Sequence, residues 1–325
     1  MAKVRAYCLI SGGLDSLLSV KLLQQQGVET IGVHFTSPFF DKSKLVEHTS
    51  RELGIPFEVV DFSQEQLAII ENPRFGFGKN INPCIDCHTQ MLKKAGSLLD
   101  LSKNEFLATG EVLGQRPMSQ NYYSLITVAK HSSFRELVVR PLSAKKLPPT
   151  KPELEGWIDR EKLLSISGRG RRQQLELAKL WELEAFHSPG GGCKLTEVLF
   201  ADKLKKIKAQ GQLNHTNLIK AMNYGRIFSP EPDKYFIVAR NEAEGDKLLC
   251  IPADFILLGT ETAGPVILGF GDFHPEELLL GEKIFSFYSK VKGESSAYFS
   301  LNGEKKHIPA FDRLDFDKIL EKMKF

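Results

Sequence analysis

The segment SGGLDS, residues 11–16, decides the fold of this chain. It follows Val4 to Ile10, a mostly apolar and β-prone run, and it leads into Leu14 to Gln26, whose leucines and valine recur at helical spacing up to Gly27. We therefore expect a strand, a glycine-rich turn and an amphipathic helix. Glycine lacks a Cβ, so backbone N–H groups can approach an anion closely, and the helix dipole favours the same charge. The segment predicts a loop that holds a phosphate chain.

Strands and helices are expected to alternate after this loop. The expected strands are Glu29 to Phe35, Phe57 to Asp61, Glu105 to Thr109 and Glu136 to Val139, and the expected helices are Leu45 to Leu53, Asp86 to Leu101 and Gln174 to Glu184. Such alternation predicts a parallel sheet covered on both faces, which is a Rossmann-like α/β fold.

A chain of 325 residues is long enough for two domains. We expect the first domain over residues 1–209, including the segment rich in Pro, Lys and Arg that begins at Leu142. Residues 213–325 contain runs such as KYFIVAR and PVILGF broken by Gly, Pro and Asp, which predicts a smaller α+β domain, a candidate for RNA binding.

Composition gives limited information about the cellular compartment of the protein and about its binding partners. The formal net charge of +3 is too small to prove a nucleic-acid partner, although charge can gather on one face. No apolar run approaches the roughly 20 residues that a membrane span needs, and the N-terminal residues lack a signal-peptide layout. We expect a cytoplasmic protein without a membrane partner, and a homodimer stays open.

Three of the five cysteines stand in unusual contexts. The segment NPCIDCH, residues 82–88, places Cys84 and Cys87 at a helix start with the spacing by which one loop can grip a metal or cluster. Cys193 follows three glycines, which let the backbone pass close to a bulky group, and we interpret it as the third thiol of one site. Placement at a helix start also predicts lowered thiol pKa values.

The spacing of two cysteines is ambiguous by itself. It also fits a redox pair, half of a zinc site, or two helix-start cysteines without chemistry. In a zinc site, His88 and His187 could be ligands. Cys8 and Cys250 lie in apolar runs, and we expect both to be buried as small hydrophobic residues.

Three segments combine cations with glycine. RFGFGKN, residues 74–80, mixes cations and aromatic rings, a composition suited to stacking on an unpaired base and contacting its phosphate. GQRPMSQ, residues 114–120, and GRGRRQQ, residues 168–174, add further cations. The predicted RNA contacts are Arg74, Lys79, Arg116, Arg169, Arg171 and Arg172.

The string SGGLDS resembles the signature of the PP-loop, or N-type, ATP pyrophosphatases, which cleave ATP to AMP and pyrophosphate while adenylating a substrate oxygen. It lacks the Gly-Lys-Ser/Thr ending of a Walker A loop. The resemblance implies that ATP and Mg²⁺ bind here and that Asp15 is catalytic. The nucleotide site that it implies comprises Ser11, Gly12, Gly13, Asp15 and Ser16 around the pyrophosphate and magnesium ion, His34 and Phe35 near the adenine, and Thr109 and Gly110 closing the site.

Together with the cysteines, this loop resembles the cluster-dependent 2-thiouridine and 4-thiouridine synthetases of tRNA. That resemblance implies that Cys84, Cys87 and Cys193 are catalytic and hold a 4Fe-4S cluster with one iron left open. Zinc, or a metal-free route through a persulfide, remains an alternative. Residues 235–244, YFIVARNEAE, resemble the RNA-binding domain of the NFACT family of ribosome quality control.

We therefore predict an ATP-dependent tRNA sulfurtransferase that adenylates a uridine carbonyl and replaces its oxygen with sulfur. Its partners would be tRNA and a sulfur donor, either sulfide or a cysteine desulfurase. One alternative is a PP-loop enzyme that uses a nitrogen nucleophile, of the amidotransferase or lysidine-forming type, but nitrogen transfer needs no set of thiols. Another is a non-catalytic RNA-binding protein, which the intact SGGLDS string disfavours.

Overall fold

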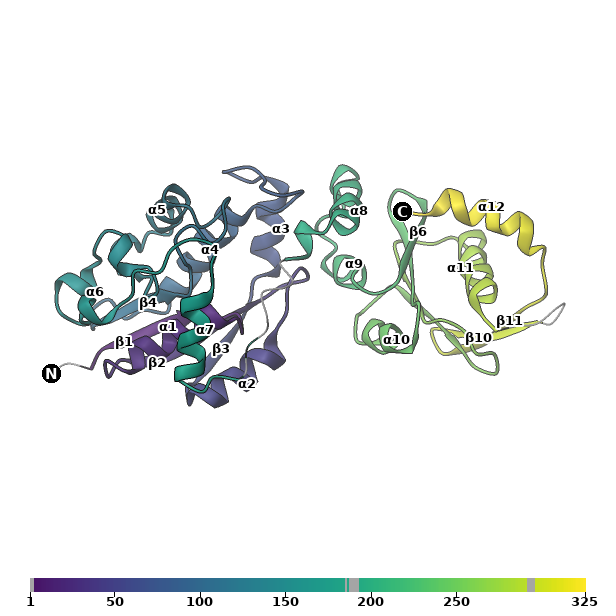
Figure 1. Ribbon diagram of the computed structural model, residues 1–325. Coiled ribbons are helices and arrows are strands. Elements are labelled where there is room, and N and C mark those ends of the chain that lie inside the picture. Colours follow the sequence, from purple (N-terminus) through teal and green to yellow (C-terminus); the bar gives the residue numbers. More distant parts are fainter. Residues whose placement is uncertain (1–2, 185, 187–192, 291–295) are drawn as a thin grey trace. The chain divides into compact units, whose positions relative to one another are not determined.

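The computed structural model describes residues 3–184, 186, 193–290 and 296–325, and the chain divides into two compact units, Met1–Glu197 and Val198–Phe325 (Figure 1). The first unit contains β1 (Arg5–Leu9), α1 (Leu14–Gln24), β2 (Glu29–Thr36), α2 (Ser43–Leu53), β3 (Phe57–Asp61), α3 (Ser63–Glu71), α4 (Cys84–Gly96), β4 (Glu105–Thr109), α5 (Tyr122–His131), β5 (Val138–Val139), α6 (Lys151–Leu154) and α7 (Arg172–Leu180).

The first unit is built on a five-stranded parallel sheet with the order β3-β2-β1-β4-β5. In the central strand, Leu9 is in register with Val33 of β2 and with Thr109 of β4. The carboxyl ends of three neighbouring strands therefore meet at one edge, where ligands of open α/β sheets bind. The predicted α/β fold with a parallel sheet is confirmed.

Alternate residues of β1 enter two separate cores. Ala6 and Cys8 belong to the core that α1, α2 and α7 cover, whereas Tyr7 belongs to the core on the side of α4 and α5 (Figure 1). The expectation of an amphipathic α1 was wrong, because this helix is buried on nearly all sides. Its outer surface is covered by the late helix α7, whose Ala178 joins the same core.

Several elements differ from the sequence predictions. Helices α3 and α5 were not expected, and β5 begins only at Val138 because Arg135–Leu137 form a 3₁₀ helix. The Pro-rich segment after Leu142 contributes Ala144, Ile158 and Ile166 to the core, so it belongs to the first unit and is not a linker. None of the helices within the described ranges is long and apolar enough to cross a membrane.

The division between the units falls earlier than the predicted end of the first domain at residue 209. Helix α8 (Val198–Ala209) and the residue after it belong to the second unit and contact its later segments. Gln210 accepts a hydrogen bond of 2.5 Å from Tyr235 Oη, and Lys206 Nζ lies 5.1 Å from the ring centre of Phe325. These contacts explain why α8 groups with the C-terminal part.

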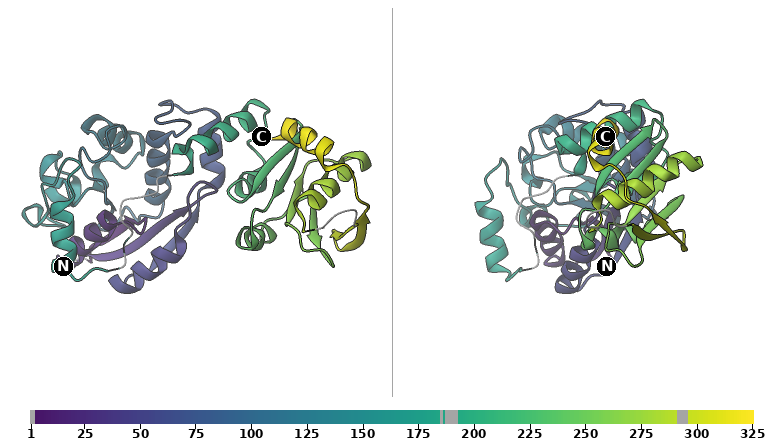
Figure 2. Two further views of the ribbon diagram at one scale, coloured as in Figure 1. Left: turned by 45° about the vertical axis from the view of Figure 1, so that its right-hand side comes forward. Right: turned by 90° about the vertical axis from the view of Figure 1, so that its right-hand side faces the viewer.

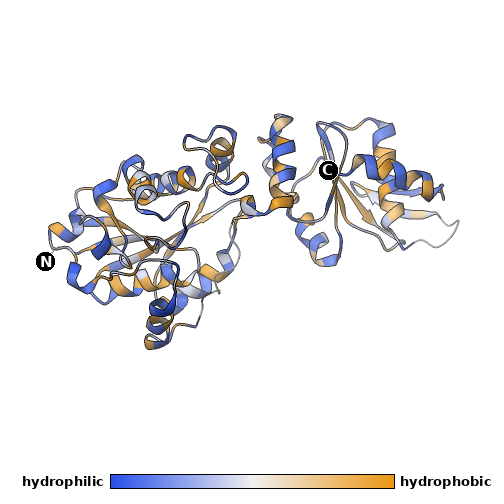
Figure 3. Ribbon diagram, turned by 45° about the horizontal axis from the view of Figure 1, so that its top comes forward, coloured by the Kyte–Doolittle hydropathy of each residue, from blue (hydrophilic) through white to orange (hydrophobic). Residues whose placement is uncertain are grey.

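The second unit is an α+β domain with a six-stranded antiparallel sheet of the order β11-β10-β8-β9-β7-β6. Helices α11 and α12 pack along this sheet (Figure 2), and hydrophobic residues run through the strands (Figure 3). Besides α8 the unit contains α9 (Thr216–Ala221), β6 (Arg226–Glu231), β7 (Lys234–Val238), α10 (Glu242–Leu249), β8 (Phe255–Gly259), β9 (Ile267–Phe270), α11 (Pro275–Tyr288), β10 (Ala297–Leu301), β11 (Glu304–Ile308) and α12 (Arg313–Met323).

Candidate functional site

The loop between β1 and α1 has a shape that only glycine permits. Gly12 has a φ of 68°, and a Cβ there would lie 2.5 Å from a side-chain carbon of Leu45. A Cβ on Gly110, which follows β4, would lie 2.5 Å from the backbone nitrogen of Ser16. The Ser16 hydroxyl donates to the carbonyl oxygen of Gly13 at 2.8 Å. The structure thus brings Gly110 against the start of α1, as the predicted nucleotide site requires.

Asp15 stands at the centre of a polar cluster. Its Oδ2 accepts a hydrogen bond of 2.7 Å from Gln115 Nε2 and lies 3.4 Å from a terminal guanidinium nitrogen of Arg171. Gln174 Nε2 in turn donates to Gln115 Oε1 at 3.4 Å. Arg171 was predicted to contact RNA, but its side chain is only 17% exposed and points to Asp15. Arg171, Gln115 and Gln174 therefore belong to the surroundings of the phosphate loop.

Within the described part of the chain, this cluster holds buried polar atoms that have no hydrogen-bond partner. They are Asp15 Oδ1, Arg171 Nε and Gln174 Oε1. A buried polar atom left unpaired costs about 1–3 kcal/mol, so three of them around one loop are unfavourable unless a polar ligand or ion completes them. This arrangement suits a charged ligand that offers both oxygen atoms and a cation.

His34 lies near the end of β2, and its side chain is buried. Its Nδ1 is 3.0 Å from the carbonyl oxygen of Ile10, so Nδ1 carries the hydrogen. Burial lowers the pKa of His34, which keeps the ring neutral and makes Nε2 an acceptor. Among the described residues this buried Nε2 has no partner. Phe35, the next residue, instead packs against Phe62 with ring centres 5.7 Å apart in the core on the side of α4.

Two hydrogen bonds hold the segment of the third cysteine beside the region of the first two. Cys84 and Cys87 lie in the first turn of α4, as predicted. The segment that begins with Cys193 is fixed at two points: Lys194 N donates to Phe39 O at 3.0 Å, and Asn80 Nδ2 donates to Thr196 O at 2.8 Å. Phe39 follows β2, and Asn80 lies in the loop before Cys84. The glycines and His187 that precede Cys193 lie outside the described residues.

The three thiols influence one another electrostatically. Burial raises the pKa of Cys87, and the charges of Cys193 and Cys84 raise it further. Burial also raises the pKa of Cys193 to about 12, with a further contribution from Cys84. Burial likewise raises the pKa of Cys84. The expectation of lowered pKa values was wrong, because desolvation outweighs the helix dipole at these positions. The coupling indicates that the three sulfur atoms gather in one region.

No three His, Cys, Asp or Glu side chains in the described ranges are arranged so that they could hold a metal ion. His88 is directed to Glu111, with Nδ1 2.9 Å from Oε1, so its Nδ1 does not serve the thiols. Coordination by Cys84, Cys87 and Cys193 would therefore require their side chains to move. Their soft sulfur donors nevertheless fit zinc or an iron–sulfur cluster chemically.

One loop, residues 110–121 between β4 and α5, contacts both parts of the site. Gln115 of this loop donates to Asp15 of the phosphate loop. In the same loop, the charge of Arg116 and the side chain of Ser119 both lower the pKa of Cys84 against the effect of burial, so both lie close to that thiol. The phosphate loop and the thiols are thus joined through neighbouring residues of a single loop.

The base of this loop is anchored by a buried ion pair that sequence reasoning missed. Glu111 Oε2 accepts a hydrogen bond of 2.9 Å from Arg140 Nε, and its Oε1 faces His88. Burial raises the pKa of Glu111, but the charges of Arg140 and His88 outweigh it and hold the pKa well below its usual range. Thr109 Oγ1 also donates to Glu111 at 3.1 Å. Glu111 therefore fixes β4 and α4 relative to each other.

The remaining predicted RNA contacts are exposed. Arg74 lies over the ring of Phe75 at 5.4 Å, and the backbone N–H of Phe75 donates to Asp86 in the first turn of α4. Arg172 lines a hollow of about 380 Å³ together with Lys146. The exposed cations of this set are Arg74, Lys79, Arg116, Arg169 and Arg172.

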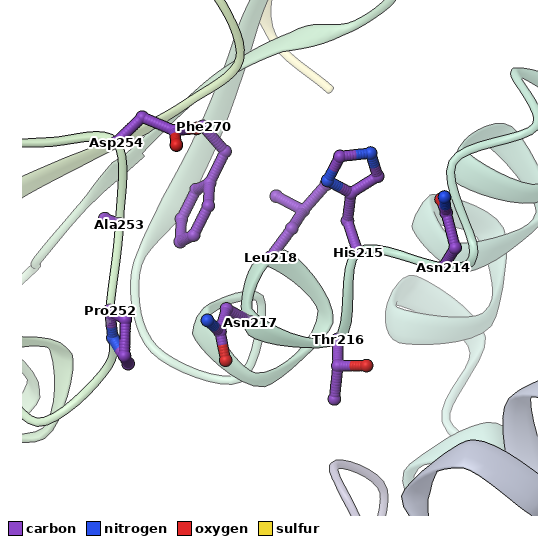
Figure 4. Close-up of a pocket in the computed structure, with 9 residues that line it drawn as sticks. All are labelled: Asn214, His215, Thr216, Asn217, Leu218, Pro252, Ala253, Asp254 and Phe270. Carbon is purple, nitrogen blue, oxygen red and sulfur yellow. The ribbon is translucent and has the colours of Figure 1, made fainter.

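A further hollow of about 380 Å³ lies within the second unit (Figure 4). Its lining residues come from the start of α9, the segment before β8 and the end of β9: Asn214, His215, Thr216, Asn217, Leu218, Pro252, Ala253, Asp254 and Phe270. Cys250, expected to be buried, is exposed in this unit because it caps the end of α10, where its Sγ lies 3.4 Å from Asp246 O. Cys8 is buried, as expected.

Comparison with known proteins agrees with this division. Residues 4–132 match the family described as the tRNA methyl transferase HUP domain, and residues 225–314 match the NFACT protein RNA binding domain. The chain resembles the PP-loop tRNA thiouridine synthetases. The first match contains the phosphate loop together with Cys84 and Cys87, and the second lies within the antiparallel unit.

Individual relatives cover only part of the chain. The tRNA-specific 2-thiouridylase MnmA 1 of Syntrophus aciditrophicus (strain SB) is 34% identical over 33% of this chain and 33% of its own length. The probable tRNA sulfurtransferase of Thermoanaerobacter sp. (strain X514) is 29% identical over 48% and 50%. The chain thus spans a third to a half of these relatives. The crystal structure of a 4-thiouridine synthetase–RNA complex with bound ATP is 22% identical and covers 56% of this chain and 53% of its own, with a TM-score of 0.35, too low for comparing the sites.

Proposed function

We propose that this chain is an ATP-dependent tRNA sulfurtransferase that adenylates a uridine carbonyl oxygen and replaces it with sulfur. The observation that carries the proposal is the loop of residues 110–121, whose Gln115 donates to Asp15 and whose Arg116 and Ser119 lie close enough to Cys84 to lower its pKa. An activating site and a sulfur site joined in this way can act on one substrate atom. The matches to tRNA-modifying relatives support tRNA as the substrate.

The first half of the reaction is activation by ATP. A uracil carbonyl oxygen is a poor leaving group, whereas the same oxygen bound to AMP departs readily. The carbonyl oxygen attacks the α-phosphate, forms a C–O–P linkage and releases pyrophosphate. Asp15 Oδ1 would hold Mg²⁺, and Arg171 would stabilise the negative charge on the departing pyrophosphate. The neutral Nε2 of His34 would accept a hydrogen bond from the nucleotide.

The second half replaces AMP by sulfur. Hydrosulfide forms a C–S bond at the activated carbon, the C–O bond breaks, and AMP leaves with the former carbonyl oxygen while the hydrosulfide proton is lost to solvent. No electrons are exchanged in this step. Cys84, Cys87 and Cys193 would hold a 4Fe-4S cluster, which when bound supplies an open iron position for an exogenous sulfur atom. Cys87 is buried and Cys84 and Cys193 are half-buried, which would limit the access of water that competes for the activated carbon.

Exposed cations beside the thiols would position the RNA. Arg116 lies close enough to Cys84 to affect its pKa, and Arg74 stands on a ring next to the first turn of α4. A phosphate bound by these cations would bring a neighbouring uridine to the sulfur site. The antiparallel unit would contribute further affinity, since residues 225–314 match an RNA-binding family.

The test is an anaerobic reaction of the full chain with transcribed tRNA, MgATP and sodium sulfide. Pyrophosphate release is measured in solution, and the nucleosides of the digested RNA are identified by mass spectrometry. We expect pyrophosphate release that depends on RNA and one thiouridine per AMP. Pyrophosphate release with an amine-modified base would favour a nitrogen nucleophile, and absence of RNA-dependent pyrophosphate release would contradict the proposed activity.

A further inference from the structure

Gln66 of α3 is a buried residue that contacts the thiols. Its side chain is 1% exposed, and its Nε2 donates to Cys87 Sγ at 3.7 Å. The same side chain lies close enough to Cys193 to lower the pKa of that thiol against the effect of burial. One side chain therefore donates to one thiol and influences a second, and the two cysteines are separated by more than a hundred residues in the sequence.

Packing alone does not require a polar side chain at position 66. Neighbouring Leu67 and Ile70 of the same helix are buried apolar residues, and an apolar side chain could fill the position of Gln66 equally well. Its Oε1 is buried and has no partner among the described residues. A buried amide with an unpaired oxygen destabilises the fold, so its polar group is in place for the sulfur atoms and for what binds them.

We propose that Gln66 is a positioning residue of the sulfur site, whose amide nitrogen holds the sulfurs of Cys87 and Cys193 toward a common centre. This inference rests on the three-thiol site of the proposed function. Hydrogen bonds from a second layer of residues orient metal ligands, and their loss typically lowers metal affinity or activity about 10–100-fold. Gln66 would thus act on a bound ion or cluster through the cysteines that it contacts.

The test uses cobalt(II) as the probe, because its thiolate complexes absorb visibly and require neither RNA nor ATP. The reduced full chain is titrated anaerobically as wild type, as Gln66→Leu, and as Gln64→Leu, a matched change at an exposed glutamine of the same helix. A Cys84→Ala variant establishes that the absorption comes from the three-thiol site. Thermal melting checks that each variant folds. If Gln66→Leu does not fold, the same cobalt(II) titration of Gln66→Ala, which adds no branched side chain, decides the outcome.

We expect Gln66→Leu to bind cobalt(II) roughly 10–100-fold more weakly than wild type and Gln64→Leu. A folded Gln66→Leu variant that binds cobalt(II) as tightly as wild type would overturn the inference, and so would a wild type that binds none. Loss of pyrophosphate release in the wild type with normal cobalt(II) binding would contradict the adenylation chemistry and leave the role of Gln66 intact.

Discussion

The phosphate loop and the three-thiol site differ in the charge that their side chains carry in the free protein. The loop combines a glycine backbone with buried, unpaired polar atoms of Asp15, Arg171 and Gln174, an arrangement that is completed by a charged ligand. Cys87 is buried, Cys84 and Cys193 are half-buried, and the pKa values of all three are raised, so in the free protein the thiols are kept neutral. The comparison teaches that one end of the site is ready for its ligand, whereas the other must exchange protons for a metal or a sulfur atom.

The loop of residues 110–121 makes these two regions interdependent. Gln115 donates to Asp15, and Ser119, four residues later, lies close to Cys84. Changes in the thiols should impair sulfur insertion and leave activation intact, whereas breaking the ion pair at the base of the loop should lower the stability of the unit that carries both. The predictions below use this contrast, from the largest expected effect to the smallest.

Replacing Cys193 should separate the two half-reactions most completely. In Cys193→Ala, RNA-dependent pyrophosphate release should persist while thiouridine formation falls below detection, because the sulfur site loses one of its three thiols. The matched control is Cys250→Ala, at an exposed cysteine of the other unit. Nucleoside mass spectrometry and a pyrophosphate assay measure the two steps, and thiouridine formation that survives in Cys193→Ala would remove this residue from the mechanism.

Replacing Asp15 should slow the first step strongly. Asp15→Asn keeps the size of the side chain but removes the charge that would hold Mg²⁺, so pyrophosphate release should fall on the order of 10²-fold or more. Cobalt(II) binding at the thiols should not change. Asp202→Asn, at an exposed residue paired with Lys205, serves as the control. An Asp15→Asn variant with normal pyrophosphate release would show that the loop does not bind the metal of the nucleotide.

Breaking the buried ion pair at the base of the loop should affect stability. Glu111→Gln leaves Arg140 buried without its counter-charge and should lower the free energy of unfolding by about 3–5 kcal/mol. The exposed pair of Arg172 and Glu176 offers the contrast, and Glu176→Gln should cost less than about 1 kcal/mol. Urea denaturation monitored by circular dichroism measures both, and equal losses would contradict the anchoring role of Glu111.

Alkaline pH should destabilise the protein through the buried, neutral thiol of Cys8. Burial raises the pKa of Cys8 from its ordinary value of 9.0 to about 12. The folded state then holds a proton that the unfolded state loses above about pH 9, so the free energy of unfolding falls as pH rises from there. Cys8→Ala should remove up to about 1.4 kcal/mol per pH unit of this dependence. Denaturation curves between pH 8 and pH 10.5 test it, and an unchanged slope would contradict a buried neutral thiol.

Much of the site could be predicted where its signal is local. The SGGLDS string and the NPCIDC segment each carry their structural meaning within a few residues, and the strands β3 and β4 begin and end where the pattern predicts. What could not be predicted depends on contacts between distant segments. Only the folded chain places Arg171 on Asp15 and brings Gln66 to Cys87 and Cys193. The predicted lowering of the thiol pKa values was wrong for the same reason, since burial is a property of the whole fold.

The most direct test of the central claim follows the uridine oxygen. Transcribed tRNA carrying ¹⁸O at both uracil carbonyl positions is incubated anaerobically with the chain, MgATP and sulfide, and the AMP produced is analysed by mass spectrometry. If activation and sulfur delivery act on the same carbonyl group, each thiouridine formed is matched by one AMP that contains a single ¹⁸O atom. AMP without the label would mean that ATP was hydrolysed by water, and it would contradict the account.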